Sequence, residues 1–487
     1  MKFIQGLSRI FSRVLQTTQD DEQAMVGGRR RFLGSSAGLV GLGWSLLHGR
    51  TLFAPDAQAK LASEAVADPS SRAPSWVPSE PPNTPMGEAK GIFPGRVVWV
   101  RDPKATPWNG DVSTGAHWWQ DNIGVNQPAV DRMISRGLQA LTGAKSDAQA
   151  WDKIFSFYNQ THQRGKNGYR KGEVIALKVN CNNCYAGYPD ADDQIDASPQ
   201  AVLAMLRQLV HYAGIPQEKI LVYEAVRVIP DRIYDPCHAE FPEVLWMDSK
   251  GDVANGRQPV DWHSNAFSYS VSENNMCGNS IPELVFKSTY IINMALLKGH
   301  PTCGFTVTAK NHYGSINERD HKMFINTWQH KMGIYNPFVD LIGTQQLGGK
   351  TILFMIDALF GTRDANDPVI PQFASWTNLF ENKWSSSFLM SLDPVAIDSV
   401  GLDFLRSEFG GYLASSHGRG HDAHCDNYLH EATLADKAPS GTIYKPDGKP
   451  LASLGVHEHW NNSKDKQYSR NLSSQGKGIE LYVVPAV

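Results

Sequence analysis

Two short motifs in this sequence combine lysine, asparagine and histidine at spacings that suit proton transfer and anion binding. They are Lys298-Gly299-His300 and Lys310-Asn311-His312. Imidazole titrates near neutral pH, so either histidine can act as a general acid, a general base or a metal ligand. Lysine ammonium groups supply positive charge for a carboxylate or phosphate group. The residues that we expect to be catalytic are His300, His312, Lys298 and Lys310.

Polar groups also end several apolar segments that the sequence predicts as strands. These ends are Lys178-Val179-Asn180, Tyr223-Glu224, Lys298-Gly299-His300, Asp357 and Asp393. Because ligands of open α/β sheets bind beyond the carboxyl ends of the strands, we predict that the lysines and histidines converge there on one ligand. The residues that we expect to bind substrate are Lys178, Asn180, Asn311, Asp357 and Asp398.

The aspartates have a second interpretation. Asp357, Asp393 and Asp398 can hold a hard cation such as Mg²⁺ or Ca²⁺, which prefers oxygen ligands. Asp393 directly precedes Pro394 at the start of a predicted helix, a pattern typical of a helix cap. We therefore favour capping for Asp393 and leave the role of Asp398 open.

Cysteines lie beside the same predicted strand ends. Cys181 and Cys184 have the C-x-x-C spacing of a half-site for Zn²⁺ or an iron–sulfur centre, and Cys303 follows His300 by three residues. These three cysteines are the candidate metal ligands. The alternative, which we favour, is a disulfide between Cys181 and Cys184, or bridges that use Cys237 and Cys277. A second group, His417, His421, His424, Cys425 and His430, is either a solvated loop or a transition-metal site.

Like charges disfavour protonation, so lysines in a shared pocket are expected to lower the pKa values of His300 and His312. The shift should shrink when Lys298 is replaced by methionine.

Periodicity predicts the elements that position these residues. Ser198-Pro199 opens a helix, with the serine as its cap, between two apolar strands, which makes a parallel βαβ unit. Residues 227–280 are predicted to be a long irregular insertion, and the polar chain after Gly410 is expected to wrap the surface. The fold class is α/β, with one domain over 96–487 built on a mostly parallel sheet that has helices on both faces. Strands are predicted at 96–100, 174–179, 219–223, 290–297, 351–356 and 388–392, and helices at 130–141, 151–158, 198–213 and 394–405.

The motifs, with Thr306-Val307-Thr308-Ala309 and Asp393-Pro394-Val395-Ala396-Ile397-Asp398, resemble the signatures of the domain-of-unknown-function family 362 over roughly residues 172–405. The resemblance implies a single α/β domain with clustered motifs, and it implies no settled reaction. Some family members carry ferredoxin modules, but this chain has no C-x-x-C-x-x-C-x-x-x-C-P run.

The amino terminus has the features of an export signal. Arg29-Arg30-Arg31-Phe32-Leu33 resembles the twin-arginine motif, a weakly apolar stretch follows, and Ala57-Gln58-Ala59 suits a signal peptidase. We expect residues 1–59 to be a signal read by the twin-arginine export machinery, and the product to be periplasmic. Residues 60–95 are rich in proline and are expected to be a disordered lead-in.

The composition excludes other classes of partner. The chain has 487 residues and a net charge of -3, so no overall positive field favours nucleic acid or an anionic membrane. No apolar run reaches the roughly 18 residues that a membrane span requires, so no stable membrane anchor is expected. We found no Gly-x-Ser-x-Gly, His-Glu-x-x-His or phosphate-loop pattern.

The sequence therefore favours an exported enzyme for a small anionic substrate, with a metal or iron–sulfur cofactor as an open question. The alternative is a non-catalytic periplasmic anion-binding protein with structural disulfides. A third interpretation, which the sequence favours less, is electron transfer through a cysteine-ligated centre.

Overall fold

A ten-stranded sheet forms the centre of the computed structural model. The structure describes residues 77–185, 187–188, 192–271, 278–300, 303–317, 332–415 and 425–484, all within the unit Pro69–Val487. The predicted signal over 1–59 lies outside the described residues. So do Cys277, His417, His421 and His424.

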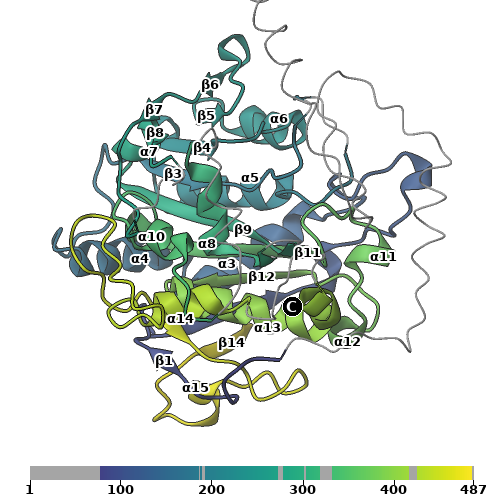
Figure 1. The fold of residues 1–487 in the computed structure, drawn as a ribbon. Helices are drawn as coiled ribbons and strands as arrows, with labels where there is room; N and C mark the ends of the chain where they lie inside the picture. The colour runs from purple at the N-terminus through teal and green to yellow at the C-terminus, as the bar shows by residue number, and fades with distance from the viewer. Residues whose placement is uncertain are drawn as a thin grey trace, which may run out of the picture. The chain divides into compact units, whose positions relative to one another are not determined.

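The sheet has the strand order β14-β2-β12-β11-β9-β3-β4-β5-β6, and β10 pairs with β9 (Figure 1). Most neighbouring pairs are parallel, as expected from apolar strands alternating with helices. The prediction of a mostly parallel α/β sheet is therefore confirmed. The strands are β2 Arg96–Arg101, β3 Ile175–Lys178, β4 Ile220–Glu224, β5 Leu245–Asp248, β6 Arg257–Pro259, β9 Tyr290–His300, β10 Gly304–Thr306, β11 Thr351–Thr362, β12 Ser387–Ser391 and β14 Glu480–Val484.

Strand β12 runs antiparallel to both of its neighbours, β11 and β2. Its carboxyl end therefore lies at the edge where the parallel strands begin. Asp393, which follows β12, is thus at the opposite edge from the other predicted strand ends. Its side chain accepts hydrogen bonds from the backbone of Val395 and Ala396 in the first turn of the next helix, so the capping interpretation is confirmed.

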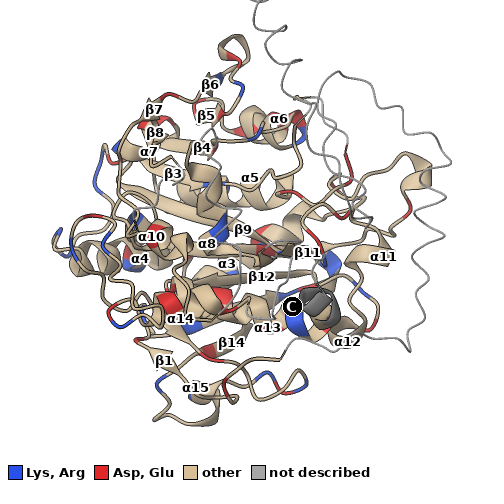
Figure 2. Ribbon diagram, in the orientation of Figure 1, with Lys and Arg blue, Asp and Glu red and all other residues tan. Residues whose placement is uncertain are grey.

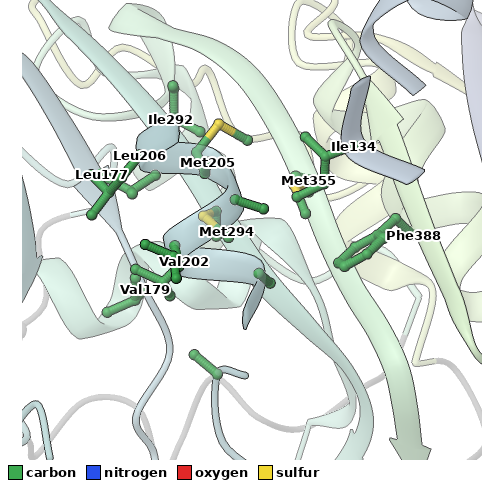
Figure 3. Close-up of a cluster of buried hydrophobic side chains, with 14 of the residues drawn as sticks. Ile134, Leu177, Val179, Val202, Met205, Leu206, Ile292, Met294, Met355 and Phe388 are labelled. Carbon is green, nitrogen blue, oxygen red and sulfur yellow. The ribbon is translucent and has the colours of Figure 1, made fainter. Parts of the chain in front are cut away.

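Helices cover both faces of the sheet. On one face, α3, α4, α5 and α6 enclose a core that contains Leu177, Val202, Ile292 and Met294 (Figure 3). On the other face, α8, α10, α13 and α14 enclose a second core that contains Leu297. The helices are α3 Gln127–Thr142, α4 Asp147–Thr161, α5 Pro199–Arg207, α6 Asp231–Glu240, α7 Glu283–Lys287, α8 Thr308–Asn311, α10 Pro337–Gly343, α11 Pro371–Ala374, α12 Thr377–Phe380, α13 Pro394–Ser415, α14 Asn427–Thr433 and α15 Ser469–Leu472.

Two segments that the sequence predicted to be irregular belong to the fold. Within 227–280, α6 leads to β5 and β6, which continue the parallel sheet. These strands are only four and three residues long, and α6 contains Pro236, so none of them has a strong sequence signal.

The two ends of the described chain also pack against each other. In the predicted lead-in, β1 Met86–Gly87 pairs with β13 Val456–His457, and Lys90 donates its backbone N–H to Asp393. In the chain after Gly410, which the sequence predicted to wrap the surface, β14 adds an edge strand beside β2. Proline tolerates this extended backbone, so the composition alone did not distinguish docking from disorder. A further small sheet joins β7 Trp262–His263 to β8 Ile281–Pro282.

Among the described residues, no helix combines the length and apolar character needed to cross a membrane.

Candidate functional site

Lys178, at the end of β3, forms a buried ion pair. Its Nζ lies 2.7 Å from Glu224 Oε2 and donates to the Val179 carbonyl at 2.6 Å. A Cβ atom on Gly314 would lie 2.9 Å from both Lys178 Nζ and Glu224 Oε1, so only glycine fits against the pair without displacing it. The charge of Lys178 is therefore neutralised within the protein.

Lys298, near the end of β9, has a different environment. Its side chain is fully enclosed, and Nζ donates to Asn180 Oδ1 at 3.3 Å and to the Ile195 carbonyl at 3.5 Å. Both acceptors are neutral amide oxygens. Asn180 Nδ2 also donates to Asn311 Oδ1 at 3.1 Å, which links the loop after β3 to α8.

The strand register explains why the two lysines do not share one pocket. Lys178 pairs with Asn293 of β9, so these two side chains point to the same face of the sheet. Lys298 lies five residues beyond Asn293, and an odd separation along a strand reverses the face. Lys178 therefore points toward α8 and Lys298 toward α5. The structure divides the predicted pocket into a Lys178 cluster (Lys178, Glu224, His312) and a Lys298 cluster (Lys298, Asn180, Asp196), joined through Asn180 and Asn311.

Charge and burial perturb the Lys298 cluster strongly. Burial, with repulsion from Lys310, lowers the pKa of Lys298 to about 8, although Asp196 favours its charged form. Burial raises the pKa of Asp196 to about 6, although Lys298 and Arg232 favour its ionised form. Arg232 Nη2 lies 3.4 Å from Asp196 Oδ2. Two oppositely charged groups thus titrate near neutral pH, which suits acid–base chemistry.

His300 and Lys310 lie at the half-buried side of this region. The backbone N–H of Cys303 donates to His300 Nδ1 at 3.2 Å, so the neutral ring carries its proton on Nε2 and can donate from that atom. Lys310 Nζ lies 5.8 Å from the Tyr313 ring centroid, and its charge acts on Lys298. Both residues are therefore suited to contact an anion near Lys298.

His312 is fully buried away from the Lys298 cluster. Its Nε2 lies 3.3 Å from Thr351 Oγ1, at the start of β11, and among the described residues Nδ1 has no hydrogen-bond partner. Burial, with a smaller contribution from repulsion by Lys178, lowers the pKa of His312 to about 3. The direction matches the sequence prediction, but burial is the main cause and the lysine involved is Lys178, not Lys298.

Asp357 and Asp398, which we predicted to bind substrate, anchor helices. Asp357 accepts from Ser198 N at 3.1 Å and Ser198 Oγ at 2.6 Å, which holds the start of α5. Ser198 occupies the predicted cap position, but its side chain makes no capping bond of its own. Asp398 accepts from Thr308 N and Oγ1, Ala309 N and the Tyr428 hydroxyl at 2.6–2.9 Å, which holds the start of α8.

The cysteines proposed as metal ligands do not form one cluster. Cys181 and Cys184 pack in the core beside α5, whereas Cys303 packs in the core on the other face. Cys184 Sγ donates to Asp196 Oδ2 at 3.3 Å, and its contact with Cys181, together with burial, holds the pKa of the Cys184 thiol well above its usual range. Among the described residues, Cys181, Cys184 and Cys237 form no disulfide. Protonated, buried thiols are weak nucleophiles and weak ligands.

The ends of β9 and β11 are held together closely. A Cβ atom on Gly299 would lie 1.8 Å from the carbonyl oxygen of Arg363, directly after β11, so the chain there can approach only a glycine. This close approach explains the glycine between Lys298 and His300.

The geometry accounts for the motifs that suggested a family resemblance. A family model described as Domain of unknown function (DUF362) matches residues 175–403. The chain is therefore similar to this family over residues 175–403. No curated protein matches the chain. The DUF362 match contains both lysine clusters and also Asp398. Its description assigns no reaction to them.

Outside the DUF362 match, a glutamate and three histidines form a third cluster, which the sequence did not predict. Glu80 Oε1 lies 2.8–3.3 Å from the Nε2 atoms of His430, His457 and His459. His430 had a sequence signal as part of the histidine-rich segment, but Glu80, His457 and His459 had none, because they meet only in the fold. Asp196 of the Lys298 cluster and its ion-pair partner Arg232 were missed for the same reason.

Proposed function

We propose that this protein is an exported enzyme that acts on a small anionic substrate at the Lys298 cluster. One observation carries the proposal. Lys298 is a fully buried cation whose hydrogen-bond partners within the described chain, Asn180 and the Ile195 carbonyl, are both neutral and lie at 3.3 and 3.5 Å. An anion that contacts Nζ would add a charged acceptor to these two neutral ones and would also offset the repulsion from Lys310.

Comparison with the other buried lysines supports this interpretation. Lys178 is neutralised by Glu224. Lys350 donates to three carbonyl oxygens, of Val285, Phe286 and Ser288, at 2.7–3.2 Å at the end of α7, so it serves as a helix cap. Lys298 has neither a counter-charge in hydrogen-bond contact nor a saturated set of acceptors.

The chemistry that we propose is proton transfer. A group whose pKa lies near the working pH is the most effective general acid or base, and Lys298 has a pKa of about 8. We assign it both the binding of the anion and the movement of the proton. Asp196 and Asn180 orient the ammonium group, and His300 Nε2–H is a second donor to the anion. His312 takes no part, since it is buried beside Thr351.

Binding of inorganic phosphate and of succinate, measured calorimetrically at pH 7, tests the site. The wild-type protein should bind at least one of these anions, and Lys298→Met should bind it at least tenfold more weakly. Lys350→Met is the matched control, because it also removes a buried lysine charge, and its affinity should equal that of the wild type. Equal affinity of Lys298→Met and wild type would overturn the proposed site.

A second experiment separates catalysis from binding. Small anionic metabolites are incubated with the wild-type protein and with Lys298→Met, and conversion is followed by NMR. The proposal predicts signals that change only with the wild-type protein. An anion that binds through Lys298 and is never converted would support the non-catalytic anion-binding alternative instead.

A further inference from the structure

A buried cluster of histidines and carboxylates joins the two ends of the described chain. One ligand atom each from Glu80, Asp426, His430 and His457 lies within 4.8 Å of the others. His457 and Asp426 are fully buried, while Glu80 and His430 keep about a tenth of their side chains exposed. The cluster therefore combines two imidazoles and two carboxylates in one small volume that is slightly exposed on one side. Figure 2 shows acidic residues around α14 in red.

The local structure aims these side chains at one point. Asp426 precedes α14 and His430 lies one turn later, so the i and i+4 positions share a face of the helix. His457 and His459 are two residues apart in extended chain, so both point to the same side. Glu80 is held opposite them because Asn83 N donates to the His459 carbonyl at 2.9 Å and β1 pairs with β13.

The hydrogen bonds made by the far ring nitrogens fix the tautomers. Ser399 Oγ donates to the Val395 carbonyl at 2.8 Å, so it accepts from His457 Nδ1–H at 2.7 Å. Asp403 Oδ1 lies 2.6 Å from His459 Nδ1 and accepts the proton of that ring. In the neutral rings, both Nε2 atoms therefore present lone pairs toward Glu80. A hydrogen bond from the far ring nitrogen to a hydroxyl or carboxylate typically orients a histidine that binds a metal.

Asp426 supplies an independent observation. It is fully buried, and neither of its carboxylate oxygens accepts a hydrogen bond from the described residues. Its Oδ2 lies 3.4 Å from His430 Nε2, which is an ion-pair distance only. A buried carboxylate without hydrogen bonds is costly unless a cation satisfies it.

We propose that Glu80, Asp426, His430 and His457 bind one divalent transition-metal ion. Imidazole nitrogens with carboxylate oxygens suit Zn²⁺, Mn²⁺ or Fe²⁺, whereas Mg²⁺ and Ca²⁺ prefer oxygen ligands alone. His459, which is hydrogen-bonded to Asp403 through Nδ1, contacts Glu80 through Nε2 and positions its carboxylate. The four proposed ligands lie outside 175–403, whereas Ser399 and Asp403, which contact His457 and His459, lie within it. None of the four ligands belongs to the Lys298 cluster.

The ion would join segments that are far apart in sequence. Glu80 and His457 are 377 residues apart, and in the described residues the β1–β13 pair between them is only two residues long. Because such a site does not exist in the unfolded chain, binding of the ion would stabilise the folded protein.

Zinc titration tests the proposal. The full chain is treated with a chelator and titrated with Zn²⁺ in a calorimeter, and its melting temperature is measured with and without the ion. We expect one equivalent to bind with a dissociation constant below about 1 μM and the melting temperature to rise. His430→Gln should weaken binding at least about a hundredfold. Ser399→Ala, which removes the hydrogen bond to His457 Nδ1 but no proposed ligand, should weaken it about tenfold.

His263→Gln is the matched control. His263 also pairs with a carboxylate, Glu283, at 2.8 Å, but it lies in the separate β7–β8 sheet and contributes no ligand to the proposed site. Its zinc affinity should equal that of the wild type. If His430→Gln fails to fold, the wild-type stoichiometry, the Ser399→Ala affinity and the spectrum of the Co²⁺ form decide the question. The Co²⁺ spectrum should lack the intense sulfur-to-metal bands that cysteine ligands would give. A wild-type protein that binds no Zn²⁺, or cysteine bands in the Co²⁺ form, would overturn the proposal.

Discussion

Lys178 Nζ and Glu224 Oε2 are 2.7 Å apart inside the protein, and Gly314 closes over the pair. Lys298, which carries the same charge and the same degree of burial, has only amide oxygens as hydrogen-bond partners among the described residues. The contrast separates the two lysines: Lys178 is neutralised within the fold, whereas Lys298 is the residue that we propose binds an anion.

Removing the counter-charge of Lys178 should destabilise the protein without changing anion binding. Glu224→Gln leaves a buried, unpaired ammonium group, which typically costs about 3–5 kcal/mol. Denaturant unfolding measures this loss. Glu240→Gln is the control: its pair with Arg207 is about one-third exposed, so the loss there should be below about 1 kcal/mol. Weaker phosphate binding by folded Glu224→Gln would show that the two clusters act as one site.

His312 should make the protein less stable in acid. Its pKa is about 3 in the folded protein and 6.5 in the unfolded chain, so between these values only the unfolded chain takes up the proton. As pH falls below 6.5, this histidine should remove stability at a rate that approaches about 1.4 kcal/mol per pH unit. Comparison of His312→Gln with wild type at pH 7 and pH 4.5 isolates the effect, since the carboxylates are common to both proteins. Parallel losses in the two proteins would contradict it.

Asp398 should matter for stability more than for ligand binding. In Asp398→Asn, the new amide group would face the Ala309 N–H and the Tyr428 hydroxyl, which now donate to a carboxylate oxygen. The new NH2 group, itself a donor, would then face two other donors. We expect a loss of about 2–4 kcal/mol in the free energy of unfolding. Urea unfolding measures the loss. An unchanged midpoint would mean that α8 does not depend on this anchor.

Export remains a prediction from the sequence. Replacing Arg29 and Arg30 with lysine should leave the precursor in the cytoplasm, because the twin-arginine pathway reads this pair. Cell fractionation with an antibody against the chain measures the distribution. A Lys2→Arg variant controls for a general effect of exchanging lysine and arginine near the terminus. Normal export of the double-lysine protein would exclude this route.

The sequence was sufficient for elements with strong local signals. The continuous apolar runs of β3, β4, β9 and β11 predicted buried parallel strands, and the structure has them. It could not show that β12 runs antiparallel, because direction depends on the partner strand; Asp393 was therefore placed at the wrong edge. Short strands such as β5 and β6 carry too few residues for a periodic signal.

The candidate site was predictable only in part for a related reason. The motifs around Lys298 and Lys178 were found from residue type and position at strand ends. Their division between two faces depends on the pairing of Lys178 with Asn293, which no local pattern contains. The contact of Glu80 with His457 spans 377 residues and likewise exists only after folding.

The pH dependence of anion affinity tests the central claim most directly. Anion binding needs charged Lys298, whose pKa is about 8, so affinity should be constant at lower pH and should fall as pH rises through that value. Phosphate is unsuitable because it titrates in the same range, so succinate, which stays doubly charged above neutral pH, is titrated calorimetrically from pH 7 to pH 10. We predict a fall approaching tenfold per pH unit above about 8.5 in the wild type and in Lys350→Met, and weak, pH-independent binding in Lys298→Met. Wild-type affinity that is unchanged between pH 7 and pH 10 would contradict the account.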